Sequence, residues 1–187
     1  MGVYLSFCKF KTITNAQFVG LENYIKIFAD KDFVNAFGFT LKFSVVSIIT
    51  INVFAFVLAL ALTRKIKGTN LFRTVFFMPN LIGGIVLGYI WQFVFSRVFV
   101  SIGETTGWSL FEISWLSTPN KAFAALVLVS VWQLAGYMIL IYVAGFMGLS
   151  EDVLEAASID GASGWVKMKN IILPLMMSSV TICLFLT

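Results

Sequence analysis

The sequence predicts an all-α protein, a polytopic bundle of helices that cross a membrane. Two observations lead to this fold class. The 187 residues are 59% hydrophobic and only 12% charged, whereas soluble globular proteins carry about 25% charged residues. The apolar residues also gather in runs close to the length of about 20 residues that a helix needs to cross a bilayer. We therefore expect a protein that is in contact with the lipid bilayer along much of its length.

The N-terminal part of the chain is the most polar. Residues 1–10 lack the basic start and the small-residue cleavage site of a signal peptide, and they are typical of the last turns of a membrane helix. Residues 11–36 contain the stretch FVGLENY. A helix there would carry four apolar side chains on one face: Leu21, Tyr24, Ile25 and Phe28. We expect this amphipathic segment to have a structural role.

A first membrane span is predicted over residues 39–62. Asn52 lies near its middle, where a hydrogen bond between helices is favoured over a contact with a transported solute. A short, strongly basic loop follows, with Arg64, Lys65, Lys67 and Arg73. Dense positive charge marks the cytoplasmic side of a membrane. The lysines near the N-terminus favour the opposite orientation, but acidic residues accompany them.

Three further apolar runs follow. The second predicted span, residues 75–95, contains Pro79 and three glycines that either pack closely against another helix or loosen this one beside a translocation path. We favour packing. The third span covers residues 122–147, and a shorter uncharged run covers residues 171–187.

A polar, glycine-interrupted loop, residues 148–170, separates the last two runs. Ser150 can cap a helix, with Glu151 and Asp152 in a first turn where the helix dipole favours negative charge. Gly161 and Gly164 should then break that helix, since glycine disfavours a helix interior by about 1 kcal/mol relative to alanine. We expect a bent helix pair outside the bilayer, with Glu155 and Asp160 as its main charges.

Seven residues in and after this loop form a spaced set: Glu155, Ala156, Ala157, Gly161, Ile171, Leu173 and Pro174. The set resembles the EAA loop of the permease subunits of binding-protein-dependent ABC importers, and all seven positions have that family's spacing. FVGLENY, the RKIKG and FRTVFFMP stretches, and WLSTPN at residues 115–120 resemble the carbohydrate-uptake members. The resemblance covers nearly the whole chain.

The resemblance implies a type I permease fold in the cytoplasmic or inner cell membrane. Residues 148–170 would dock on a cytoplasmic ABC ATPase dimer, with Glu155 paired to a basic group, Asp160 beside it and Gly161 at the bend. The other partners would be a second permease subunit and an extracytoplasmic solute-binding protein. Family members carry further helices before residue 1 and after residue 187, so the resemblance also implies a fragment, truncated at both ends.

The third span carries the candidates for a solute path. Sugars are bound by amide and hydroxyl groups together with aromatic faces. Aromatic residues in membrane helices are more often packing groups. The four candidates for lining a sugar path are Trp132, Gln133, Tyr137 and Met138.

Other chemistry is disfavoured. The chain has no histidine and two distant cysteines, so we expect no metal site, cofactor or catalytic residue. It also has no glycine-rich Lys/Ser phosphate loop, which leaves ATP hydrolysis to a partner. The basic residues lie next to apolar runs, which fits membrane orientation and not nucleic-acid binding. The alternatives are an ABC permease for a polyol phosphate, an amino acid or a peptide, and a non-ABC carrier, membrane enzyme or anchor whose loop has no partner.

Overall fold

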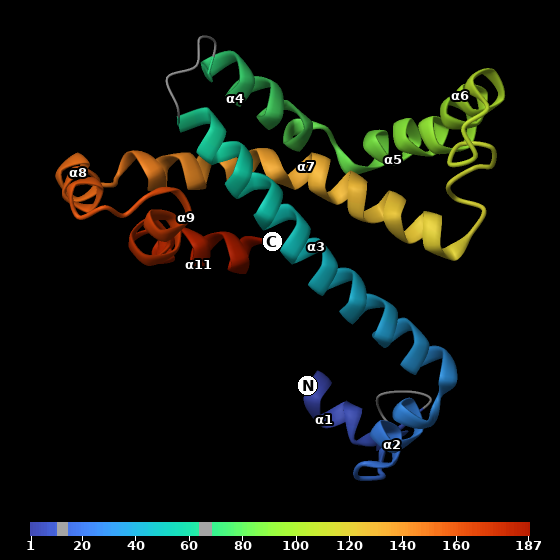
Figure 1. The fold of residues 1–187 in the computed structure, drawn as a ribbon. Helices are drawn as coiled ribbons and strands as arrows, with labels where there is room; N and C mark the ends of the chain where they lie inside the picture. Colours follow the sequence, from blue (N-terminus) through green and yellow to red (C-terminus); the bar gives the residue numbers. More distant parts are fainter. Residues whose placement is uncertain (11–14, 64–68) are drawn as a thin grey trace. The chain divides into compact units, whose positions relative to one another are not determined.

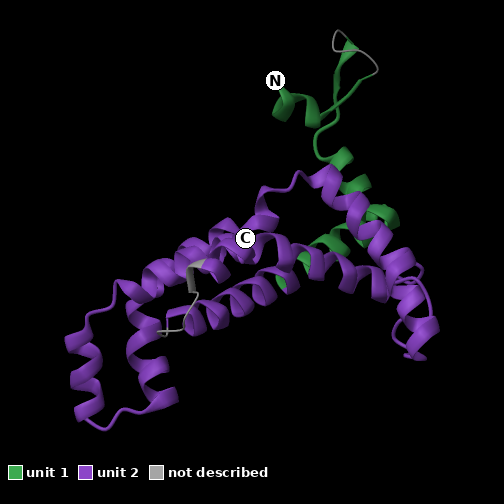
Figure 2. Ribbon diagram, turned by 90° about the horizontal axis from the view of Figure 1, so that it is seen from above, with its two compact units in different colours: residues 1–45 green, residues 46–187 purple. Residues whose placement is uncertain are grey.

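The computed structural model describes residues 1–10, 15–63 and 69–187 (Figure 1). Most of the chain is helical, which confirms the predicted fold class. The chain divides into two compact units, Met1–Val45 and Val46–Thr187 (Figure 2). Within the described residues, three helices are long and apolar enough to cross a membrane, and one bent helix pair passes the same test as a fourth. Of the basic loop predicted to mark the cytoplasmic side, Arg64, Lys65 and Lys67 lie outside the described residues.

The first unit opens with short elements. They are α1 (Gly2–Ser6), β1 (Cys8–Lys9), β2 (Gln17–Phe18) and α2 (Glu22–Ala29). The two strands are antiparallel, with Cys8 opposite Phe18. The structure differs here from the expected helix end over residues 1–10, because the chain leaves α1 at Phe7 and extends into β1.

Asn23, within FVGLENY, connects α2 to the segment before it. Its Nδ2 donates to the carbonyl oxygens of Ser6 and Cys8, at 2.9 and 3.0 Å. The hydroxyl of the neighbouring Tyr24 lies 2.7 Å from that of Ser6. These contacts hold the FVGLENY stretch to the segment that precedes it.

The first long helix, α3 (Lys31–Thr63), begins earlier than the span expected over residues 39–62. Asp30 precedes it, and its Oδ1 accepts a hydrogen bond from the backbone N–H of Asp32 at 2.9 Å. An N-cap of this kind satisfies one of the free donors of the first turn. Hydropathy marks only the apolar part of a helix, whereas the cap sets its true start.

The second apolar run is broken. Helix α4 (Thr69–Phe77) is followed by a 3₁₀ turn, η2 (Met78–Leu81), and a new helix starts at Gly84. The expected span over residues 75–95 therefore differs from the structure, because Pro79 has no N–H to donate and its ring disfavours a helix interior. The new helix continues as α5 (Gly84–Phe93), the π turn η3 (Val94–Val98) and α6 (Phe99–Thr106).

The core of the second unit lies between α3, α7 (Pro119–Met147) and α11 (Met177–Leu186). In this core the Tyr142 hydroxyl of α7 donates to Oδ1 of Asn52 on α3 at 2.8 Å. Nδ2 of Asn52 donates to Ile48 O at 2.8 Å and to the Thr187 hydroxyl at 3.2 Å. The prediction that Asn52 makes a hydrogen bond between helices is confirmed.

Gly136 of α7 sets the distance between α7 and α4. A Cβ atom at this position would lie 1.9 Å from the carbonyl oxygen of Phe76, so only glycine allows this approach. The glycines that sequence analysis selected for packing behave differently. A Cβ at Gly84 or Gly88 would meet no atom within 4 Å in the described part of the chain.

Candidate functional site

The loop between α7 and the last apolar run folds into two short helices. The first, α8 (Glu151–Ile159), has Ser150 at its N-cap position and Glu151 and Asp152 in its first turn, as predicted. The Ser150 side chain makes no capping hydrogen bond, so the expected cap is present by position and backbone conformation alone. The two acidic side chains lie where the helix dipole favours negative charge.

Gly161 ends this helix in a Schellman motif. The N–H of Ala162 donates to the carbonyl of Ala157 at 2.9 Å, and the N–H of Gly161 donates to that of Ser158 at 3.2 Å. Gly161 has φ +81°, a left-handed conformation that glycine adopts without steric cost. The predicted break at Gly161 thus has a specific geometry, which reverses the chain.

Lys167 joins the two arms of the reversed chain. It ends α9 (Gly164–Lys167), and its Nζ donates to the Leu154 carbonyl and to the Ser158 hydroxyl, both on α8. The two arms lie side by side in both ribbon views (Figures 1 and 2). Sequence analysis missed this contact, because a lysine next to a membrane span is usually explained by topology.

A second π turn, η4 (Met168–Ile172), leads into Pro174. The N–H of Leu173 bonds to the carbonyl of Met168, five residues back. The wide turn directly precedes the proline, whose missing N–H and ring disturb regular α-helical bonding. The short helix α10 (Leu173–Leu175) then meets α11 at a 70° bend. The short apolar run expected over residues 171–187 is therefore bent and is not one continuous helix.

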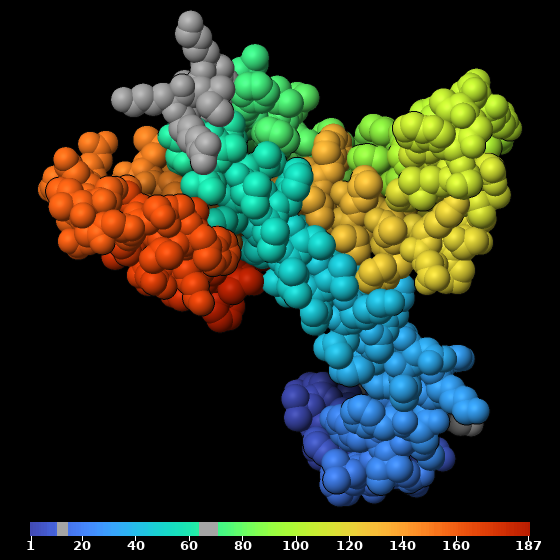
Figure 3. Space-filling model, in the orientation of Figure 1, coloured from blue at the N-terminus to red at the C-terminus, as the bar shows by residue number. Residues whose placement is uncertain are grey.

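Most of the seven spaced residues, which lie between α8 and α10, are at the surface. Ala157 is buried and Ile171 is half-buried, whereas the others are exposed: Glu155, Ala156, Gly161, Leu173 and Pro174. Asp160 is also exposed. Figure 3 shows the atoms of residues 148–170, in orange, at one end of the second unit.

Apolar side chains accompany the charges on the same element. Ile159 and Trp165 are 79% and 77% exposed, and Val153 and Val166 are also exposed. An exposed apolar surface next to a few charges is typical of a protein contact site. We name α8, its turn and α9 the helical loop.

The four candidates for a sugar path do not converge. Met138 is buried in the core between α3, α7 and α11. Trp132 lies about 140° around α7 from Tyr137, because they are five residues apart. Gln133, half-buried, and Tyr137, 42% exposed, are four residues apart and so share a face of α7.

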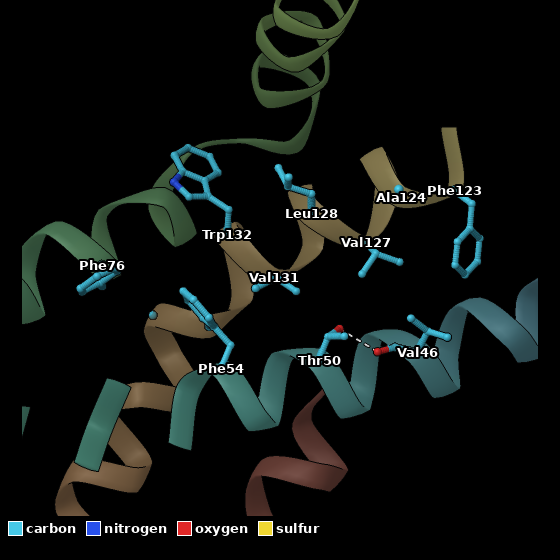
Figure 4. A pocket seen from close by; sticks show the side chains of 12 residues that line it. Val46, Thr50, Phe54, Phe76, Phe123, Ala124, Val127, Leu128, Val131 and Trp132 are labelled. Atoms are coloured by element: carbon cyan, nitrogen blue, oxygen red, sulfur yellow. Dashed lines mark hydrogen bonds between the residues drawn. The ribbon is translucent and has the colours of Figure 1, made fainter. Parts of the chain in front are cut away.

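Trp132 borders an apolar cavity of about 580 Å³ between α3, α4 and α7 (Figure 4). Of the side chains that line it, only Thr50 and Trp132 carry a polar atom. The Thr50 hydroxyl donates to the carbonyl of Val46 at 2.7 Å. This cavity offers hydrocarbon groups a good surface but gives the hydroxyl groups of a sugar almost no partners.

A smaller hollow of about 220 Å³ lies between α5 and α7 and has more polar groups. Trp91, Gln92 and Ser130 are among the residues that line it. The ring N–H of Trp91 is buried without an acceptor in the described part of the chain. Ser130 lies on the same face of α7 as Gln133 and Tyr137, at spacings of three and seven. Trp91 and Gln92 were missed because they lie in a run that sequence analysis treated as packing.

Comparison with known proteins finds a matching family and similar relatives. Residues 51–187 match the family described as binding-protein-dependent transport system inner membrane component. The chain is 42% identical, over its whole length, to the probable starch degradation products transport system permease protein AmyD of Thermoanaerobacterium thermosulfurigenes. It is 33% identical, over 96% of its length, to the multiple sugar-binding transport system permease protein MsmF of Streptococcus mutans. It spans 64% and 62% of the lengths of these relatives.

A solved structure has the same fold. A bacterial alginate ABC transporter, crystallised in complex with an alginate-pentasaccharide-bound periplasmic protein, superposes with a TM-score of 0.76. The match covers 89% of this chain and 59% of the other, at 22% identity.

Proposed function

Because the chain belongs to the family of binding-protein-dependent transport system inner membrane components, we propose that it forms part of the permease of an ABC importer. The solute is a sugar or oligosaccharide. Its transport across the cytoplasmic membrane is driven by ATP hydrolysis in partner subunits. The observation that carries the proposal is the helical loop, which presents Glu155, Ala156 and Gly161 of the spaced set at its surface.

The helical loop is the docking element for a cytoplasmic ATPase dimer. Its two short arms, joined by Lys167, form one compact body with exposed apolar side chains, and helices of this kind commonly bind in grooves. Glu155 is exposed on α8 and would pair with a basic group of the ATPase. Asp160 and Gly161 form the turn between the arms.

Glu155→Lys tests this docking in the full-length protein. We expect uptake to be lost and the ATPase to dissociate, while the protein still inserts and holds its second permease subunit. Asp152→Lys is the matched control, since it reverses an exposed acidic charge on the same helix, about 60° around the helix axis and one turn nearer its start. Normal uptake by Glu155→Lys, or equal loss in both variants, would contradict the assigned role of Glu155.

The solute path runs along one face of α7, past Ser130, Gln133 and Tyr137. Trp91 and Gln92 line the hollow beside Ser130, so amide, hydroxyl and aromatic groups lie together there. Trp132 contributes through its contact with Trp91, whose ring centroid is 5.4 Å away. Met138 would support these residues from within the core.

Gln133→Leu tests the path. Losing one neutral hydrogen bond of about 1 kcal/mol should raise the KM for uptake about fivefold. Ile141→Val, an apolar change on the same helix away from the hollow, should leave KM within twofold. An unchanged KM in Gln133→Leu would remove Gln133 from the path.

The partners and the solute are identified together. A mild-detergent pull-down of the full-length protein from native membranes should recover an ATPase, a second permease and a solute-binding protein. The names of AmyD and MsmF refer to starch degradation products and to sugars, so the binding protein should bind an oligosaccharide and not a polyol phosphate, amino acid or peptide. Recovery of the chain alone, where other membrane complexes stay intact, would contradict the importer proposal.

A further inference from the structure

Helix α2 in the first unit has two unlike faces. Leu21, Ile25 and Phe28 are spaced by four and three residues, so they share one face. They are 62%, 68% and 66% exposed in the described part of the chain. Glu22 and Lys26 lie on another side and form an ion pair. The hydrogen bond from Lys26 and its positive charge lower the pKa of the Glu22 carboxyl, so this carboxyl stays charged near neutral pH.

The contacts of α2 within its own unit use a different surface. Asn23 donates to backbone carbonyls of α1 and β1. The ring of Tyr24 packs on that of Phe7, with centroids 5.4 Å apart. Asn23 and Tyr24 therefore hold α2 to the elements before it, and the three exposed apolar side chains lie on another surface of the helix.

The exposed face of α2 continues onto a membrane-spanning helix. Only Asp30 separates α2 from α3, and α3 is long and apolar enough to span a bilayer. The ring of Phe28 meets that of Phe33 edge-on at 5.8 Å, and Phe33 stacks on Phe37 at 6.1 Å. Phe33 and Phe37 are also exposed. An exposed row of aromatic rings thus leads from α2 onto the first turns of α3.

The row of rings from α2 to α3 indicates what covers the apolar face of α2. Only one residue separates α2 from a helix that is long and apolar enough to cross a bilayer, and aromatic rings are enriched at the bilayer surface. We propose that α2 lies flat in the membrane surface, with Leu21, Ile25 and Phe28 inserted at the boundary between headgroups and acyl chains. Glu22 and Lys26 face water and headgroups. Amphipathic helices bind the interface in this way, through buried apolar area and charge.

Spin-label accessibility tests this placement. A nitroxide is attached to Ile25→Cys or Phe28→Cys, and to Glu22→Cys or Lys26→Cys as matched controls on the same helix. The full-length protein is reconstituted in vesicles of phosphatidylcholine and phosphatidylglycerol. Cys8 and Cys183 are buried, at 2% and 0% exposure, and the unsubstituted protein serves as the labelling blank.

Labels at Ile25 and Phe28 should be several-fold more accessible to oxygen, which dissolves in the bilayer, than to a water-soluble nickel chelate. Labels at Glu22 and Lys26 should show the reverse. Nickel access at all four positions would place α2 in water and overturn the proposal. Exclusion of both reagents at Ile25 and Phe28 would mean that protein covers this face and would overturn it too. Leu21→Cys repeats the test should either variant fail to fold.

Discussion

The ammonium nitrogen of Lys167 lies 2.7 Å from the hydroxyl oxygen of Ser158, and the turn at Gly161 separates the two residues along the chain. The same nitrogen donates to the carbonyl of Leu154. One side chain therefore joins two turns of α8 to the end of α9. The stiffness of the helical loop depends on this contact as well as on its backbone.

Replacing Lys167 with methionine keeps the length of the side chain and removes its donors. The stability of the helical loop should fall by about 1.5 kcal/mol, since hydrogen bonds from a charged group are worth about 1.5–3 kcal/mol. Hydrogen exchange over residues 150–170 should speed up about tenfold in consequence. Lys167→Arg should restore slow exchange. Lys169→Met is the control, because the Lys169 side chain is exposed and makes no hydrogen bond within the described residues. Equal acceleration in both methionine variants would contradict the role of Lys167.

Gly161→Ala should loosen the same turn by a different route. A non-glycine residue pays about 1–2 kcal/mol for the left-handed conformation, which Gly161 adopts at φ +81°. Limited proteolysis between α8 and α9 should become faster, while the unfolding temperature of the whole protein should change little. Gly161→Asn should have a smaller effect, since asparagine tolerates this conformation. Equal cleavage of wild type and Gly161→Ala would exclude strain at this position.

Gly136→Ala should destabilise the contact between α4 and α7. The added methyl group would meet the Phe76 carbonyl oxygen at 1.9 Å, and overpacking of this kind costs about 1–3 kcal/mol. Thermal unfolding in detergent should show a lower midpoint. The matched control is Gly88→Ala, where a Cβ has no neighbour within 4 Å. A midpoint lowered as much by the control would mean that the close approach is not the cause.

Tyr142→Phe and Asn52→Leu should show coupled effects on stability. Either change removes the 2.8 Å hydrogen bond between α3 and α7. Hydrogen bonds between membrane helices have coupling energies of about 0.6 kcal/mol, with a maximum near 1.7. Chemical unfolding in bicelles of both single variants and the double variant measures this energy. Strict additivity would show that the bond contributes nothing to folding.

The sequence predicted the helical class, Asn52 and the break at Gly161 because each depends on local chemistry. Apolar runs, a lone amide inside one of them and a glycine after a capped helix all have short-range explanations. Pro79 also indicated a break in the second apolar run. The high average hydropathy of the run led to the prediction of one continuous span there. The start of α3 was placed too late for a related reason, since Asp30 and the charged first turn lie outside the apolar stretch.

The rest depends on contacts that no spacing encodes. Lys167 reaches Leu154 only after the turn at Gly161 has set the direction of the returning chain. The importance of Gly136 depends on how closely Phe76 approaches, and the break after α4 determines that approach. The same break positions Trp91 and Gln92 beside Ser130. Contacts between residues that are far apart in the sequence cannot be predicted from the spacing of residues along one chain.

The bonds of Asn52 fix the register of three helices. In a bundle held by methyl groups, one helix can slide along another at small cost, because one apolar contact replaces another. The Asn52 amide accepts from Tyr142 on α7 and donates to Thr187, the residue that follows α11. A shift of either helix by one turn would strand these polar groups in hydrocarbon. The three helices therefore have a single axial alignment, so α3, α7 and α11 should tilt or rotate as one block and not slide past one another.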